Sequence, residues 1–114
     1  MPVTVEQVRA LALTLPRTEE ALVRDRVKFR VRSLVYVSFS RDETLMGFGF
    51  PKHERESLVA SDPETFLMPV ESDLRYHWVR ARCTALDEPE MYELVTDAWR
   101  MVVPKFLARE RLGT

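Results

Sequence analysis

Five cationic residues alternate with apolar or acidic neighbours over a nine-residue stretch: Arg24, Arg26, Lys28, Arg30 and Arg32. Alternate residues of a β-strand point to the same side, so one continuous strand would place all five side chains on a single face. Arginine binds phosphate through two N–H groups at once and also stacks on bases. Each phosphate contact releases counterions and makes binding sensitive to salt. The pattern predicts a surface for nucleic acid or another anion.

The neighbouring residues leave a second interpretation of this row open. Asp25 interrupts the alternation, and a bend there or a turn near Val27 would produce a strand pair whose cations do not share one face. Exposed strand faces need polar residues in any case, and cations on an edge strand oppose aggregation. With 17 basic and 18 acidic residues, the chain can also pair many of these charges internally. An ordinary surface role therefore stands beside anion binding.

A second alternating segment, residues 76–83 (YHWVRARC), can extend the cationic surface. As a strand it would place Trp78, Arg80 and Arg82 on one face and small apolar residues on the other. A tryptophan beside arginines is typical of proteins that stack the bases of nucleic acids. We therefore predict that these three residues join the cationic row in binding.

No motif points to catalysis or to a bound metal. His53 and His77 have no ligand spacing to each other or to Cys83, the only cysteine, which cannot form an internal disulfide. The serines lack the context of a nucleophile elbow, and a single Gly-Phe-Gly is too short for a phosphate-binding loop. We expect no enzyme, no cofactor and no metal. A concave pocket that gathers Asp73, Tyr76 and His77 would reopen the enzyme class.

Length and composition limit the class of protein. At 114 residues the chain is expected to form one domain, residues 1–114, around one core. The net charge of −1 gives the whole molecule no strong attraction to a polyanion, so nucleic-acid binding requires segregated charge. No apolar run is long enough to span a membrane, and the first residues lack the apolar centre of a signal peptide. A cytoplasmic location is expected, and the excess of arginine over lysine fits a bacterium with a GC-rich genome.

Two strands are predicted after the cationic row, over residues 34–39 and 45–50, joined as a hairpin by the polar tripeptide Arg-Asp-Glu. Both segments are rich in β-branched or aromatic residues. Gly47 and Gly49 lie two apart in the second strand and therefore share a face. Their missing side chains leave room there for another backbone or a bulky side chain.

Helices are predicted at both ends of the chain. The first spans about residues 4–15 and ends at Pro16, and a short helix starts at Pro51 between strands. The last helix is capped by Asp87 and should kink or end at Pro104. Because helices and strands are segregated, we expect an α+β fold in which the N- and C-terminal helices pack on one face of an antiparallel sheet.

The chain resembles the MmcQ/YjbR family through LALTLP, KFRV, ESLVASDPETF, YHWV and ELVTDAWRMVVPKFLA, which follow one another over nearly its whole length. The resemblance implies a CyaY-like fold, related to frataxin, and DNA binding through a proposed double-wing arrangement of the sheet. It implies no catalytic residues. The iron-binding acidic helix associated with frataxin-like proteins is not expected here, because the first helix contains Glu6 as its one acidic residue.

Two functions from different classes follow. The first is a non-enzymatic DNA-binding protein that contacts phosphates through the basic sheet face. The alternative is a protein-interaction or small-anion-binding module in which the same cations meet an acidic protein or a small anionic ligand. Near the C-terminus, Trp99, Met101 and Phe106 are predicted to belong to the core or to a dimer contact. Exposure of these side chains would favour a protein partner.

Overall fold

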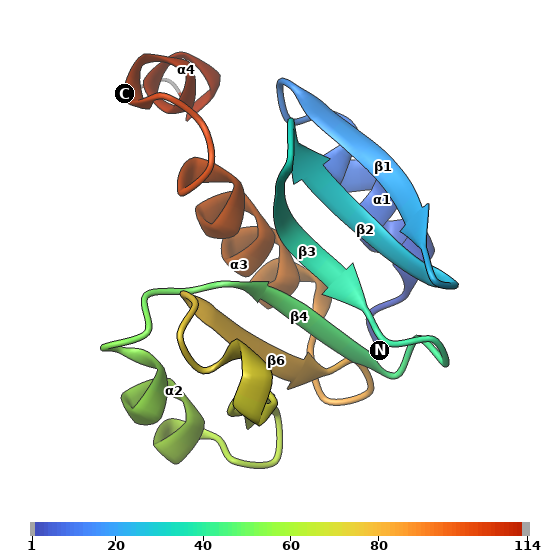
Figure 1. Ribbon diagram of the computed structural model, residues 1–114, viewed down its shortest axis with the longest axis vertical. Coiled ribbons are helices and arrows are strands. Elements are labelled where there is room, and N and C mark those ends of the chain that lie inside the picture. The colour runs from blue at the N-terminus through green and yellow to red at the C-terminus, as the bar shows by residue number, and fades with distance from the viewer. Residues whose placement is uncertain (1, 113–114) are drawn as a thin grey trace.

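One antiparallel sheet of six strands, in the order β1-β2-β3-β4-β6-β5, forms the front layer of the computed structural model, which describes residues 2–112 (Figure 1). All neighbouring strands run antiparallel. The bounds of the strands are β1 Thr18–Val23, β2 Arg26–Val31, β3 Leu34–Phe39, β4 Leu45–Gly49, β5 Phe66–Leu67 and β6 Trp78–Arg82. The predicted α+β class is confirmed.

The cationic row folds as a hairpin and not as one strand. Arg24 and Asp25 have φ angles of 52° and 66°, the left-handed conformations that a tight two-residue hairpin turn requires. Arg32 has a φ of 57° in the next turn, between β2 and β3. Arg24 and Arg32 therefore lie in the turns at the two ends of β2. The prediction that all five cations share one strand face is wrong, and the bent strand pair is the arrangement observed.

Helices α1 (Val5–Ala12) and α3 (Glu88–Arg100) both lie behind the sheet in Figure 1, which confirms that the terminal helices cover one face. Thr4 completes a capping box at the start of α1, and the predicted cap of α3 forms, since the Asp87 side chain accepts from Glu90 N. Helix α1 ends at Ala12, three residues earlier than predicted, with Leu13 as its C-cap.

The remaining helices lie at the edges of the molecule. Helix α2 (Arg55–Ser61) lies beside β6, and a single 3-10 turn (Glu71–Asp73) follows β5. Helix α3 ends four residues before Pro104, where its end or a kink was predicted, and helix α4 (Lys105–Leu112) follows the proline. Arg111 of α4 donates to the Thr14 hydroxyl. No helix among residues 2–112 is both long and apolar enough to cross a membrane.

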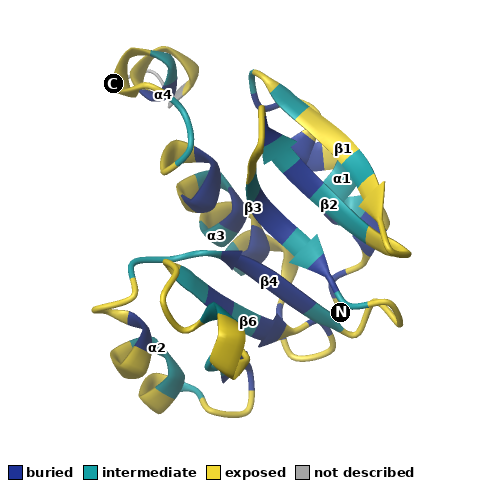
Figure 2. Cartoon of the chain, viewed as in Figure 1, coloured by how far each residue is buried: buried dark blue, intermediate teal, exposed yellow. Residues whose placement is uncertain are grey.

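The core lies between the sheet and helices α1 and α3, as the buried residues of the inner strands and of α3 show in Figure 2. One continuous cross-strand row of paired and buried residues forms its centre: Phe29, Val37, Phe48 and Val79. Trp99 of α3 is fully buried, and its Nε1 donates to the Pro16 carbonyl at 2.9 Å. Its predicted place in the core is confirmed, whereas Met101 and Phe106 are 43% and 58% exposed.

The sheet opens at its middle. Strands β3 and β4 pair over Val37–Phe39 and Met46–Phe48, and the start of β3 diverges from the end of β4 (Figure 1). A bulge adds to this opening: Phe29 faces Val37 but Arg30 faces Val35, so Tyr36 is an extra residue in β3. The sheet is therefore two half-sheets, β1-β2-β3 and β4-β6-β5, joined along a short seam.

Candidate anion-binding groove on the sheet

A groove of about 840 Å³ lies along the seam between the two half-sheets. Four of its residues form one cross-strand row: Lys28 pairs with Ser38, Ser38 with Gly47, and Gly47 with Arg80. Directly paired residues share a face, and this row lies on the face opposite to the core row. The volume falls within the range of ligand-binding clefts, roughly 300–1,000 Å³. We call this cavity the seam groove.

Trp78 lies across the floor of the seam groove. A Cβ on Gly47 would be 2.6 Å from Trp78 Nε1 and 2.9 Å from Cε2, closer than real atoms approach, so the indole occupies the space that glycine leaves free. Gly49 differs, because a Cβ there would meet Ala98 Cβ of α3 at 3.6 Å, an ordinary contact distance. The close approach of a bulky side chain that the spacing predicted is therefore found at Gly47.

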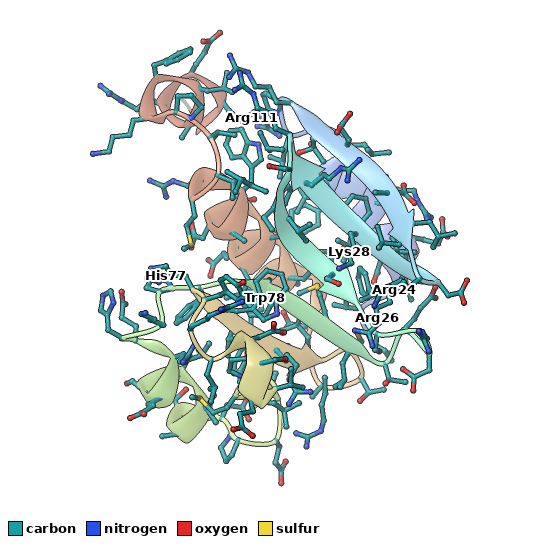
Figure 3. The ribbon with its side chains drawn as sticks, in the orientation of Figure 1. Arg24, Arg26, Lys28, His77, Trp78 and Arg111 are labelled. Atoms are coloured by element: carbon teal, nitrogen blue, oxygen red, sulfur yellow. The ribbon has the colours of Figure 1, made fainter. Side chains whose placement is uncertain are left out.

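Arg26 and Lys28 bring unpaired positive charge to the seam groove. Both line it from β2, and neither forms an ion pair or a side-chain hydrogen bond with any residue in the described part of the chain. Figure 3 shows them at one side of β3 and β4, with Trp78 at the other. The cavity thus has cations on one half-sheet and an aromatic ring on the other.

Three of the predicted binding arginines already have partners within the chain. Arg30 Nε lies 3.4 Å from a carboxylate oxygen of Glu19 on β1. Arg80 donates from Nε and Nη2 to the Met68 carbonyl at 3.0 and 2.8 Å. Arg82 donates to the carbonyls of residues 63 and 64. The Arg30 contact joins β2 to β1, and the Arg80 and Arg82 contacts join β6 to residues 63–68. The three arginines therefore have structural roles.

Arg55 was missed as a functional candidate at the sequence level, although it determines the shape of the groove rim. Its side chain is buried, and its guanidinium donates to the carbonyls of Leu74, Tyr76 and Trp78 at 2.6, 2.9 and 3.4 Å. A signal existed: Arg55 precedes the half-buried Leu58 by three residues, a spacing that places both on one face of α2.

The rim carries the three residues whose gathering in a concave pocket would reopen the enzyme class. Asp73, Tyr76 and His77 all line the seam groove. His77 Nδ1 accepts from the Lys52 backbone N–H at 3.0 Å, which leaves the ring proton on Nε2. Within residues 2–112, no side-chain hydrogen bond joins these three residues, and no group of three or more His, Cys, Asp or Glu is placed to hold a metal ion.

Comparisons with known proteins agree with this architecture. The model of the YjbR family matches residues 13–101, more than half of the chain. The fold is similar to the crystal structure of Deinococcus radiodurans protein DR2400, which is described by a DUF419 domain, with a TM-score of 0.78 and 20% sequence identity. That similarity covers 97% of this chain and 88% of the other and shows the shared fold. No curated protein is detectably similar to the chain.

Proposed function

The chain belongs to the YjbR family, and from that premise we propose that it is a non-enzymatic protein that binds single-stranded nucleic acid through Arg26 and Lys28. The observation that carries this proposal is the pair of unpaired cations lining a groove that also contains an aromatic side chain. Proteins that bind single strands combine these two features, a positively charged groove and rings on which bases stack.

The cation set is smaller than the sequence predicted. Arg30, Arg80 and Arg82 are held by their own chain, so they add little to a phosphate site. Arg24 is exposed in the turn before β2, close to Arg26, and extends the unpaired charge beyond the groove (Figure 3). With so few contacts, we expect affinity in the range of non-specific binding, on the order of 10⁻⁴–10⁻⁶ M. The proposal includes a cytoplasmic location, where single strands are accessible.

Fluorescence anisotropy with a labelled single-stranded oligonucleotide across a salt series tests the proposal. Charge reversal of both cations (Arg26→Glu with Lys28→Glu) should abolish binding at moderate salt. Replacement of the same cations by glutamine should lower the salt slope by about 1.4, because each phosphate contact on a single strand contributes about 0.7. A labelled duplex in the same series should bind more weakly, because its bases are not free to stack.

The matched control reverses two cations that do not line the seam groove, Lys105→Glu with Arg109→Glu on α4, and changes the net charge equally. This variant should bind as the wild type does. Equal losses in the two variants, or no binding by the wild type at low salt, would contradict the proposal. Recovery of the oligonucleotide unchanged after incubation is expected, and its cleavage would overturn the non-enzymatic assignment.

The concave shape of the groove favours a second candidate, a small anionic ligand, which was the alternative inferred from the sequence. A cavity of about 840 Å³ can enclose a small molecule between the half-sheets. Saturable binding of a nucleoside monophosphate together with no binding of an oligonucleotide would favour this candidate.

A further inference from the structure

Besides the cations that phosphate binding requires, the seam groove contains an aromatic ring and a hydroxyl group. Trp78 faces it from β6, Ser38 lies at its centre, and Lys28 lines it from β2. We propose that the groove holds one unstacked nucleotide unit of the strand, with the base against Trp78 and the phosphate at Lys28 and Arg26. This inference rests on the proposed function and specifies which part of the ligand each half-sheet recognises.

The strand register fixes the span between the two contacts. Lys28, Ser38 and Gly47 are directly paired neighbours on β2, β3 and β4, and the Trp78 indole covers Gly47. Neighbouring strands are about 4.8 Å apart, so the indole lies roughly 10 Å from the β2 backbone. A base with its sugar and phosphate extends over a distance of this order. A Lys28 side chain reaching toward the seam shortens the span further.

Two polar groups in the groove have no partner within the described residues. Neither the Ser38 hydroxyl nor the Trp78 indole N–H makes a hydrogen bond to the rest of residues 2–112. Ser38 belongs to β3 and the Trp78 Nε1 lies over Gly47 of β4, where a sugar hydroxyl or a base edge would be. A largely apolar cleft with a few such polar groups is the usual composition of a ligand site.

The rim of the groove is held in place before any ligand binds. The Arg55 guanidinium bonds three carbonyls of residues 74–78, and the Lys52 backbone N–H bonds His77. The segment that carries Tyr76 and Trp78 is therefore fixed from behind by α2 and the turn before it. Preorganisation of this kind lowers the entropy cost of binding, because the segment is already ordered.

Four probes test the inference: a single-stranded oligonucleotide, a strand of the same length without bases, a nucleoside monophosphate and ribose 5-phosphate. The intrinsic tryptophan fluorescence reports on Trp78. The Trp78→Phe variant gives the remaining emission of the buried Trp99, which is subtracted as background. Each base-bearing probe should quench the signal. The base-free strand should bind about 5- to 150-fold more weakly without quenching, because stacking one base contributes about 1–3 kcal/mol.

The variant Trp78→Ala should lower the affinity for the base-bearing strand to that of the base-free strand and leave the base-free strand unaffected. Trp78→Phe keeps a ring and should retain intermediate affinity, and circular dichroism identifies a variant that has lost its fold. Equal affinity of the wild type for the two strands would overturn the inference.

The same probes separate the inference from the proposed function. If both strands bind equally and reversal of Arg26 and Lys28 abolishes both, the base site fails and strand binding stands. If the nucleoside monophosphate quenches Trp78 while neither strand binds, strand binding fails and the groove remains a nucleotide site. If ribose 5-phosphate competes as well as the nucleoside monophosphate, the base contributes nothing and the inference fails.

Discussion

At the scale of single residues, the arrangement of the groove depends on Gly47. The Trp78 indole lies where a Cβ on this residue would be, whereas the space beside Gly49 accepts a Cβ at an ordinary contact distance. The two glycines lie two residues apart in one strand, so both have a strand backbone. They differ in the side chains that lie nearest to them. They therefore provide a matched pair for testing the position of the indole.

We predict that Gly47→Ala displaces Trp78 and costs about 1–3 kcal/mol of unfolding free energy, the usual cost of an overpacked site. Gly49→Ala should be neutral or stabilise the protein by about 0.4–1 kcal/mol, because it restricts the unfolded chain. Urea denaturation measures both effects, and the tryptophan emission of Gly47→Ala should shift to longer wavelength. Equal stability of the two variants would show that the indole does not occupy this position.

Buried ionisable groups give the protein a sensitivity to alkali. Burial raises the pKa of Tyr36 to about 12, and it raises the pKa of the Cys83 thiol, aided by Asp42, to about 11. Cys83 therefore remains a protonated and inert thiol at neutral pH. The Tyr36 hydroxyl also lies 2.7 Å from the Thr18 hydroxyl on β1, which links the bulge of β3 to the edge strand.

We predict a loss of stability between about pH 10 and pH 12 that depends on Tyr36. The folded state holds the phenol proton up to pH 12, whereas the unfolded chain releases it near pH 10, so stability is full below pH 10 and falls above it. The loss from this group approaches roughly 2–3 kcal/mol. Urea denaturation at several pH values should show a steeper decline for the wild type than for Tyr36→Phe. Parallel declines would contradict this prediction, since Cys83 is common to both proteins.

At the scale of elements, α2 acts as a support for the strand that carries Trp78. Its buried Arg55 satisfies three carbonyls of residues 74–78, a segment with little regular secondary structure of its own. Backbone carbonyls shielded from water need hydrogen-bond partners, and here one side chain provides them for three of the five carbonyls in the segment. The inserted helix is therefore part of the groove's construction.

We predict that Arg55→Met costs on the order of 2–4 kcal/mol of unfolding free energy, because the buried carbonyls lose charge-assisted hydrogen bonds. Hydrogen exchange in residues 74–78 should accelerate. The control is Arg75→Met in the same segment, whose exposed guanidinium lies 4.8 Å from the centre of the Tyr76 ring and should matter by less than about 1 kcal/mol. Similar losses in both variants would show that Arg55 does not support the segment.

At the scale of the whole molecule, the short seam creates a cavity in a protein whose net charge is close to neutral. The net charge is −1, so no general attraction draws the molecule to a polyanion. Ion pairs in the described part of the chain engage three of the 17 lysines and arginines: Arg9, Arg30 and Arg100. Binding is therefore assigned to the groove by comparing the charge reversal of Arg26 and Lys28 with the reversal on α4.

The sequence was sufficient to predict the elements, because local physics determines them. The capping residues Thr4 and Asp87 and the β-branched and aromatic content of β3 each act through residues within a few positions. The role of Gly47, room for a bulky neighbour, also followed from the spacing of the two glycines. The two-sided sheet also followed, since alternation assigns each side chain to a face.

Tertiary structure alone decided which cations are available for a ligand. Arg24 and Arg32 lie in turns, whereas Arg26 and Lys28 lie in strand β2. The left-handed residues of these turns have no unambiguous signal in the sequence. Arg30 and Arg80 were occupied by partners 11 and 12 positions away, and Arg55 turned inward to carbonyls about 20 positions away. Pairing of charges and closure of a groove depend on contacts between distant segments, which periodicity does not encode. The sequence by itself determined the sheet and its helices, and the packing of the two half-sheets determined the site.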